Sequence, residues 1–314
     1  MAQIEEMKSG VTDTLHKRSK LAKRNEKIFY YGLMLLPLLQ FCIFYIGVNF
    51  QSIGLAFSKY ENNEFSIATD FFMNFKQIFA EFKDGTLLIA FRNSIVLWFF
   101  GALCGTGIAI FFSYYVFKRK GAGRFFRFIL FLPSILPAVL MGRVFWQFTS
   151  DVLPKLFGID VILTDGTNVQ KLVAIIGYCV WVSFGTQVLL YSNAMEQLSP
   201  SILEAAQLDG VSPMQELVRI ILPNLMPTVS TFMIASIAGA FMNQANLYTF
   251  YGERGTNYGD IYTVGYYLFI MVQENSDVYG KHLFPYASAL GLFCTCIAIP
   301  LTVLFRKFSK RFEE

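Results

Sequence analysis

The residue types that usually carry covalent chemistry are sparse in this sequence of 314 residues. The two histidines, His16 and His282, lie far apart in polar segments, and all five cysteines fall inside long apolar segments. No pattern predicts a zinc site or a convergent set of acid, base and nucleophile. The phosphate-binding pattern G-x-x-x-x-G-K-[ST] is also missing from the sequence. The sequence therefore favours non-covalent chemistry, in which side chains bind or release another molecule.

Polar and aromatic side chains interrupt two of the apolar segments. The first group comprises Trp181, Ser183, Thr186 and Gln187, and the second comprises Asn243, Gln244 and Asn246. Residues spaced i, i+3 and i+4 share one face of a helix, which predicts that Ser183, Thr186 and Gln187 point the same way. Such groups can bind a neutral polar ligand, or they can hydrogen-bond neighbouring helices to one another. Both roles stay open for a single residue, while Ser183, Thr186, Asn243 and Asn246 together favour a ligand path.

A polar stretch from Ser199 to Pro227 carries the signals of two short helices joined by a tight turn. Ser199 is a suitable N-cap and Pro200 suits the first helical position, so a helix is predicted to run to about Asp209. Gly210 can adopt the left-handed conformation that ends it. Ser212 and Gln215 then have the spacing of a capping box, which predicts a second helix. We call this stretch the elbow; it predicts an ordered connector that contacts another molecule.

The elbow contains Glu204-Ala205-Ala206, then Asp209-Gly210, then Ile220 and Pro223. This spacing resembles the EAA loop of permeases in ATP-binding-cassette (ABC) importers, above all carbohydrate permeases of the maltose and multiple-sugar type. The resemblance implies that the first elbow helix is a coupling helix that docks on a separate cytoplasmic ATPase. It places Glu204, Ala205, Ala206, Asp209 and Gly210 at that contact. The alternative is a pair of interfacial amphipathic helices without a partner.

The composition is that of an integral membrane protein, since 54% of the residues are hydrophobic and only 15% are charged. A helix needs about 20 apolar residues to cross the bilayer. The sequence predicts six such transmembrane helices, at about 28–50, 87–117, 125–148, 169–193, 224–250 and 284–305. The predicted fold is therefore all-α, with both termini on the same side of the membrane.

Lys and Arg accumulate at the cytoplasmic ends of membrane helices, so their positions predict the orientation. Seventeen of the 26 flank the predicted helices on the side of the termini, and six lie in the loops of the other side. This predicts that the N and C termini and the elbow are cytoplasmic, as an ATPase-docking loop requires. The net charge of +4 comes without a basic helix or an aromatic stacking platform, so nucleic acid is not a predicted partner.

The resemblance also implies an architecture. Residues 1–27 would form a basic cytoplasmic tail, and 28–314 a transmembrane permease domain in the bacterial inner or plasma membrane. Its core, at about 87–308, would have the MetI-like arrangement of five helices named after methionine permeases, with one extra helix on the N-terminal side. The EAA loop would span 195–223.

The implied assembly contains further subunits. These are a second, similar but non-identical permease, a cytoplasmic ATPase dimer that holds ATP and Mg²⁺, and an extracellular solute-binding protein. This chain would be a non-catalytic subunit without a cofactor of its own, and would translocate a carbohydrate, with an oligosaccharide favoured. The alternative function is a secondary carrier or channel for a small polar solute. No Asp or Glu lies near the centre of a predicted span, which argues against proton coupling.

Overall fold

The computed structural model describes residues 25–118, 123–158, 161–252, 260–273 and 280–310. The chain divides into two compact units, Met1–Leu55 and Ala56–Glu314. Most of the first unit belongs to an apolar helix, Asn25–Ala56, that includes a π-helical stretch at Phe41–Gly47 and the helix α2 (Val48–Ala56). The predicted basic tail lies almost wholly outside the described residues, so its boundary after residue 27 stays a prediction.

The second unit begins with a small β-hairpin that the all-α prediction did not include. Strands β1 (Ser58–Glu61) and β2 (Glu64–Ile67) pair antiparallel, with Ser58 opposite Ile67. Asn62 and Asn63 both have positive φ, which is what a two-residue hairpin turn needs. Helix α3 (Met73–Lys83) follows, and its Glu81 accepts hydrogen bonds from Tyr267 (3.1 Å) and Tyr286 (2.6 Å), which hold the helix to the bundle.

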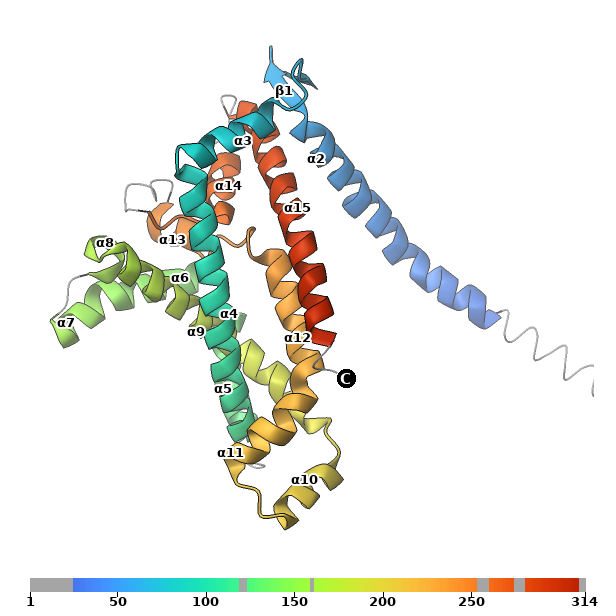
Figure 1. Cartoon of the computed structure of the whole chain (residues 1–314), viewed down its shortest axis with the longest axis vertical. Helices are drawn as coiled ribbons and strands as arrows, with labels where there is room; N and C mark the ends of the chain where they lie inside the picture. The colour runs from blue at the N-terminus through green and yellow to red at the C-terminus, as the bar shows by residue number, and fades with distance from the viewer. Residues whose placement is uncertain (1–24, 119–122, 159–160, 253–259, 274–279, 311–314) are drawn as a thin grey trace, which may run out of the picture. The chain divides into compact units, whose positions relative to one another are not determined.

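Long helices form the body of this unit (Figure 1). They are α4 (Thr86–Lys118), α9 (Asn168–Glu196), α12 (Leu222–Gly239) and α15 (Phe284–Ser309). Together with the N-terminal helix, the described residues contain five helices long and apolar enough to cross a bilayer, and a bent pair that would make a sixth. The prediction of six membrane segments is thus confirmed as the upper count.

The third predicted span, 125–148, is not one straight helix. It divides into α5 (Gly123–Ile135) and α6 (Ala138–Gln147), which meet at 96°. The break falls at Leu136-Pro137, because a proline disfavours helical backbone at the residue before it. A π-helical turn (Phe148–Val152) and the short helices α7 (Leu153–Phe157) and α8 (Ile162–Asp165) lead on to α9.

The fifth predicted span, 224–250, is shifted along the chain. The second elbow helix, α11 (Pro213–Glu216), runs through a π-helical turn (Leu217–Ile221) into α12, so that one helix extends over Pro213–Gly239. Pro223 is the second residue after this π-helical turn. Beyond Gly239 the helix ends, and the short helices α13 (Leu247–Tyr251) and α14 (Val264–Gln273) follow before a 3₁₀ turn (Lys281–Leu283) and α15.

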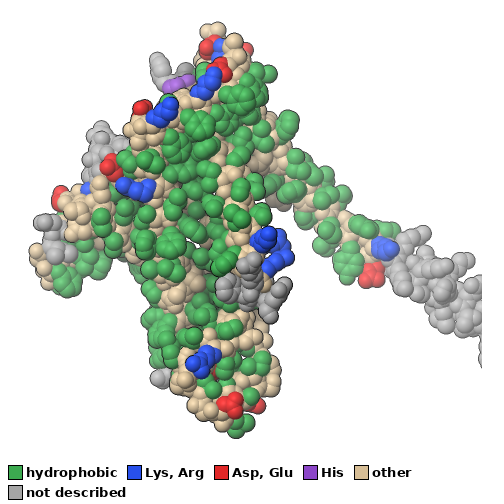
Figure 2. All heavy atoms as spheres, viewed as in Figure 1, with side chains coloured by type: hydrophobic (Ala, Val, Ile, Leu, Met, Phe, Trp, Pro, Cys, Tyr) green, Lys and Arg blue, Asp and Glu red, His purple; other side chains and the backbone are tan. Residues whose placement is uncertain are grey.

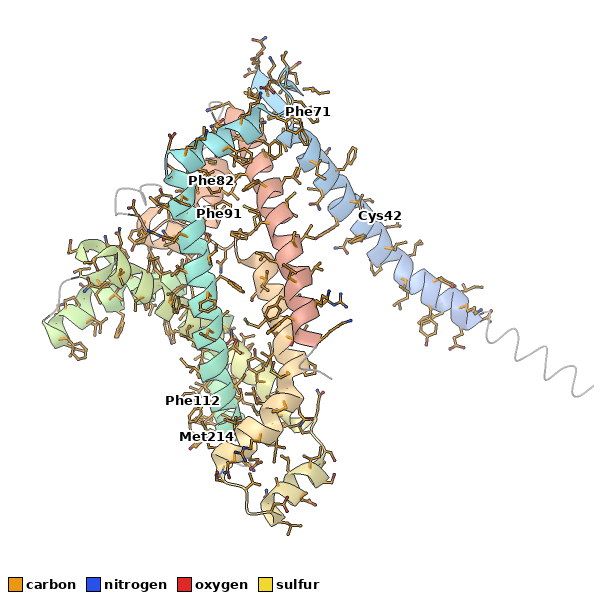
Figure 3. The ribbon with its side chains drawn as sticks, viewed as in Figure 1. Cys42, Phe71, Phe82, Phe91, Phe112 and Met214 are labelled. Atoms are coloured by element: carbon orange, nitrogen blue, oxygen red, sulfur yellow. The ribbon has the colours of Figure 1, made fainter. Side chains whose placement is uncertain are left out.

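Two clusters of buried apolar residues hold the unit together. One joins α3, α4, α6, α9, α13, α14 and α15. Phe82 packs against this cluster beside its member Phe91, with ring centroids 5.1 Å apart (Figure 3). The other lies toward the elbow and joins the C-terminal part of α4 to α9, to the π-helical turn Leu217–Ile221 and to α12. Hydrophobic side chains cover much of the surface seen in Figure 2, and charged ones gather near α3 and near the elbow. Such a surface suits contact with lipid between two polar ends.

Candidate functional site

The elbow has the local structure that its sequence predicts. Helix α10 (Pro200–Leu208) ends at the C-cap Asp209, and Gly210 has a φ of 68°. The Gly210 N–H donates to Gln207 O and the Val211 N–H donates to Ala206 O, both at 3.2 Å, which is a Schellman motif. In the predicted capping box, Gln215 Oε1 accepts a hydrogen bond from the Ser212 N–H at 3.1 Å. The predicted end of the first elbow helix and the predicted start of the second are thus confirmed.

Ser199 occupies the N-cap position but does not cap α10 with its side chain. Its Oγ lies 2.7 Å from Ser201 Oγ instead. Pro200 stands at the first helical position as predicted. The start of α10 therefore depends on the proline, whose fixed φ suits a helix, more than on the serine hydroxyl.

The outer face of the elbow is exposed and partly apolar. Leu208 is 89% exposed and Met214 60%. Glu204, Ala205, Asp209 and Gly210 are exposed around them, whereas Ala206 is buried. Exposed large apolar side chains bordered by acids and small residues are typical of a protein interaction site. The structure brings the five predicted coupling residues onto one short segment at one end of the bundle (Figure 1).

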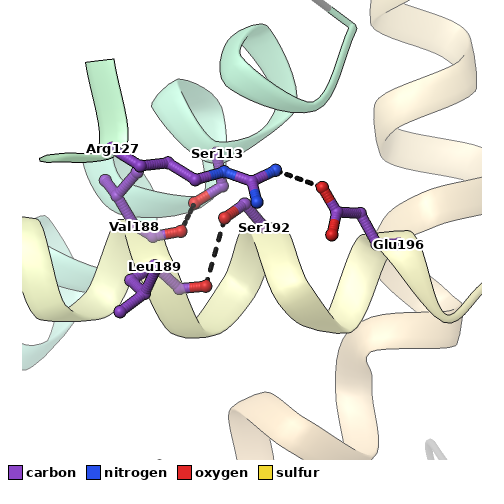
Figure 4. A network of polar contacts seen from close by, with 6 residues as sticks. All are labelled: Ser113, Arg127, Val188, Leu189, Ser192 and Glu196. Atoms are coloured by element: carbon purple, nitrogen blue, oxygen red, sulfur yellow. Dashed lines mark hydrogen bonds and ion pairs between the residues drawn. The ribbon is translucent and has the colours of Figure 1, made fainter. Parts of the chain in front are cut away.

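Helices at the elbow end are joined by charged and polar contacts. Arg127 of α5 pairs with Glu196 at the end of α9 (Figure 4). Deeper in the same region, Ser113 Oγ of α4 donates to Val188 O at 3.1 Å. These contacts fix α4 and α5 against α9, the helix that leads into the elbow.

A cavity of about 520 Å³ lies between α4, α9 and the end of α12. Its polar lining comprises Ser94, Trp98, Ser183, Gln187, Ser236, Asn243 and Thr263. None of the described residues that line it is charged. The Gln187 Oε1 atom is buried and accepts no hydrogen bond from the described residues. A neutral polar ligand could supply the missing donor, since a buried polar atom without a partner is unfavourable.

Only part of the two predicted polar groups reaches this cavity. Ser183, Gln187 and Asn243 line it, while Trp181, Thr186, Gln244 and Asn246 are not among its lining residues. Asn246 instead donates to Ala138 O at 2.7 Å and to the Tyr178 hydroxyl, so it joins helices to one another. Ser183 and Gln187 lie nearly one above the other on α9, and Thr186 lies at the edge of the same face, a residue step of about 100° from Gln187.

The sequence predicted that Asn243, Gln244 and Asn246 lie within a membrane helix, and this prediction is wrong. They follow the end of α12, where the backbone is irregular and Ala245 and Asn246 have positive φ. Asn243 stabilises this segment, because its Oδ1 accepts from the Ala245 N–H at 2.8 Å and its carbonyl accepts from Thr263 Oγ1 at 3.3 Å. Irregular backbone between membrane helices is typical of segments that line a cavity.

Four of the polar lining residues were not predicted: Ser94, Trp98, Ser236 and Thr263. Ser94 and Trp98 are four residues apart on α4, a polar pair on one face that the sequence could have indicated. The Ser94 Oγ accepts from the Val264 N–H at 3.0 Å. Beside it, the buried Asn93 side chain donates to Asp260 O (2.8 Å) and Tyr262 O (3.1 Å). These bonds hold the segment before α14 against α4.

Within the described ranges, no group of three His, Cys, Asp or Glu residues is placed to hold a metal ion. What the geometry offers is therefore a neutral cavity and an exposed elbow. The same long helix, Pro213–Gly239, begins at the elbow and ends at the cavity.

Comparisons with known proteins agree with this arrangement. Residues 89–314 match the sequence family described as binding-protein-dependent transport system inner membrane component. A "Probable ABC transporter permease protein" of Mycoplasma pneumoniae is 25% identical over 214 residues, which cover 64% of each chain. The "Multiple sugar-binding transport system permease protein MsmF" of Streptococcus mutans is 23% identical over 291 residues, 90% of this chain and 97% of that protein.

The fold also occurs among solved structures. It is a chain of a bacterial alginate ABC transporter in complex with an alginate pentasaccharide-bound periplasmic protein. The TM-score is 0.71 at 19% identity, and the match covers 92% of this chain and 96% of that one. The predicted MetI-like permease fold is thereby confirmed.

Proposed function

Because the chain belongs to the family of binding-protein-dependent transport system inner membrane components, we propose that it is a pore-forming permease subunit of an ATP-driven importer for a carbohydrate. The observation that carries the proposal is the exposed elbow helix α10, in which Leu208 is 89% exposed. The continuous helix Pro213–Gly239 starts in the elbow and ends at the cavity. A surface of this kind suits docking of an ATPase, and the cavity suits the passage of a solute.

The same arrangement supports the predicted topology. The elbow and the end of α4 lie at one end of the bundle, and the β-hairpin and α3 lie at the other (Figure 1). The excess of Lys and Arg on the elbow side supports a cytoplasmic elbow and cytoplasmic termini. The hairpin end would then face outward, where a solute-binding protein would deliver its ligand.

The proposed assembly needs further subunits. A second, similar but non-identical permease would complete the pore, and a dimer of ABC ATPases would bind ATP and Mg²⁺. The alginate transporter was solved with a saccharide-bound periplasmic protein, which supports a solute-binding protein as the third kind of partner. In this assembly, closure of the ATPase dimer would draw the two elbows together and turn the pore from inward-facing to outward-facing. Hydrolysis of ATP would reset it.

The neutral cavity supports an uncharged saccharide as the solute. The side chains of Ser183, Gln187 and Asn243 can hydrogen-bond sugar hydroxyl groups, and the indole of Trp98 can contact an apolar ring face. The name of the Streptococcus mutans relative refers to multiple sugars, which supports the same class. An anionic solute such as a glycerol phosphate ester would need cations from the partner permease, because an unpaired charge is costly to bury.

The coupling role is tested by substitution of Glu204. Glu204→Lys places a cation on the exposed face of α10 without changing the buried side of the helix. We expect the protein to insert in the membrane and to lose both solute uptake and co-purification of the ATPase in mild detergent. Glu64→Lys is the matched control, since Glu64 is also an exposed carboxylate, in β2. Normal uptake with Glu204→Lys would refute the coupling role.

The competing function, a secondary carrier or channel, predicts a different result. A carrier would move solute as a purified single chain in liposomes, and no ATPase would accompany it. Transport without any partner would replace the importer assignment with the carrier.

A further inference from the structure

The buried carboxylate of Glu216 connects the elbow to α4. Glu216 is the last residue of α11 and its side chain is only 5% exposed. Its Oε1 lies 2.6 Å from Lys118 Nζ, and its Oε2 accepts a hydrogen bond of 3.2 Å from the Tyr114 hydroxyl. Lys118 Nζ also lies 5.7 Å from the centroid of the Tyr114 ring. Three side chains from two helices thus form one compact group.

This group is placed where the elbow becomes a membrane helix. Gln215, in the capping box with Ser212, immediately precedes Glu216, and the π-helical turn Leu217–Ile221 immediately follows it. Lys118 is the last residue of α4. A buried carboxylate is costly unless it is paired and hydrogen-bonded. The elbow end of the helix Pro213–Gly239 is therefore held to the end of α4 in one specific arrangement.

A second contact joins the same two helices beside the cavity. Trp98 Nε1 of α4 donates a hydrogen bond of 3.0 Å to Ser236 Oγ of α12, and both residues line the cavity. Twenty residues separate Trp98 from Lys118, and twenty separate Glu216 from Ser236. At 1.5 Å per residue, the two contacts lie about 30 Å apart along the helices.

Apolar packing fills the part of the interface nearer the elbow. Ile110 and Val116 of α4 belong to one buried cluster with Leu217, Ile221 and Leu225. The two helices are therefore fastened by polar contacts at the elbow and at the cavity, with buried side chains between them.

From this geometry we infer that α4 and the helix Pro213–Gly239 move as one unit, and that the Glu216–Lys118 pair transmits a displacement of the elbow to the cavity wall. The inference rests on the proposed function, since the ATPase supplies the displacement. Glu216 and Lys118 are positioning residues: they line no part of the cavity and act through α4. Without the ion pair, the elbow could shift relative to the end of α4, although the contact between Trp98 and Ser236 remains at the cavity.

The test uses the full complex with its ATPase and follows hydrogen exchange with and without a non-hydrolysable ATP analogue. The readout is the nucleotide-dependent change in exchange rate over 94–102 in α4, at the cavity. In the unmodified chain we expect the analogue to change this rate. In Glu216→Gln, which keeps the shape and removes the charge, we expect the change to shrink about fivefold or more, while the ATPase still co-purifies.

Two further variants make the result specific to the ion pair. Lys118→Arg keeps the charge and is expected to keep the response. The double variant Glu216→Lys with Lys118→Glu reverses the pair and is expected to recover more of the response than Glu216→Lys alone. A full response in Glu216→Gln, or no recovery in the reversed pair, would overturn the inference. If the ATPase fails to co-purify with the unmodified chain, the proposed function itself fails.

Discussion

Gly185 of α9 lies directly against the backbone carbonyl of Leu130 in α5. A Cβ atom at Gly185 would stand 1.8 Å from Leu130 O and 2.8 Å from Phe131 Cα. Small residues let membrane helices approach this closely, and backbone atoms cannot give way as a flexible side chain can. This crossing holds the first half of the broken third span against α9, the helix that carries Ser183 and Gln187 to the cavity.

The first prediction concerns this crossing. Gly185→Ala should lower the free energy of unfolding by about 1–3 kcal/mol, because the added methyl group has no space. Gly177→Ala is the control in the same helix, since a Cβ there meets nothing within 4 Å; it should be neutral or slightly stabilising. Thermal unfolding of the purified protein in detergent measures both. Equal stability of the two variants would show that α5 and α9 are farther apart than described.

The second prediction concerns Gly210, whose φ of 68° ends α10. A Cβ atom there meets nothing within 4 Å, so the backbone conformation alone should decide the effect of a substitution. Left-handed backbone costs about 1–2 kcal/mol for most residues, and asparagine tolerates it best. Gly210→Asn should therefore retain the co-purified ATPase and Gly210→Val should lose much of it. Equal retention by both variants would show that the elbow does not need this turn.

The third prediction separates two neighbouring residues of α9. Gln187 lines the cavity and Thr186 does not. Gln187→Leu should weaken uptake about two- to tenfold, the loss expected for one hydrogen bond to a neutral solute. Thr186→Val, its control, should leave uptake unchanged. The measurement is initial uptake of the saccharide that the cognate binding protein retains from a panel of sugars, with ATPase association checked for both variants. A larger loss in Thr186→Val would exclude this cavity as the solute path.

The fourth prediction concerns acid sensitivity at the start of α3. The hydrogen bond from Lys76 lowers the pKa of Asp70 below its ordinary 3.8, and Asp70 Oδ1 also accepts from the Phe72 N–H at 3.3 Å. A lowered pKa means that this contact stabilises the folded helix start fully above pH 3.8, and that the contribution is lost as the pH falls through the lowered value. The protection of the amides over 72–76, measured against their intrinsic exchange rate at each pH, should therefore fall in acid.

Asp70→Asn should remove this acid dependence, because the amide does not titrate. Asp84→Asn, at the other end of α3, is the control and should leave the exchange over 72–76 as it was. Persistent acid dependence in Asp70→Asn would assign the effect to another group.

The elbow shows how much local sequence determines. Three local effects set its helices: capping by Ser212 and Gln215, the fixed φ of Pro200, and the left-handed turn at Gly210. Each acts only on residues a few positions away in the sequence. Their outcome does not depend on distant segments, so both helices were predictable. The membrane helices were predictable for a related reason. In lipid, a run of about 20 apolar residues can pair all its backbone N–H and C=O groups within the run by forming a helix.

The cavity and the connections between helices were decided by the tertiary structure. Trp98 and Ser236 are 138 residues apart in the sequence, and Glu216 reaches Lys118 across nearly a hundred. Helical periodicity places a side chain on a face of its own helix, but only packing decides which face meets which partner. For this reason Asn246 became a link to Tyr178 rather than a lining residue, and Trp98, which the sequence did not single out, became a wall of the cavity.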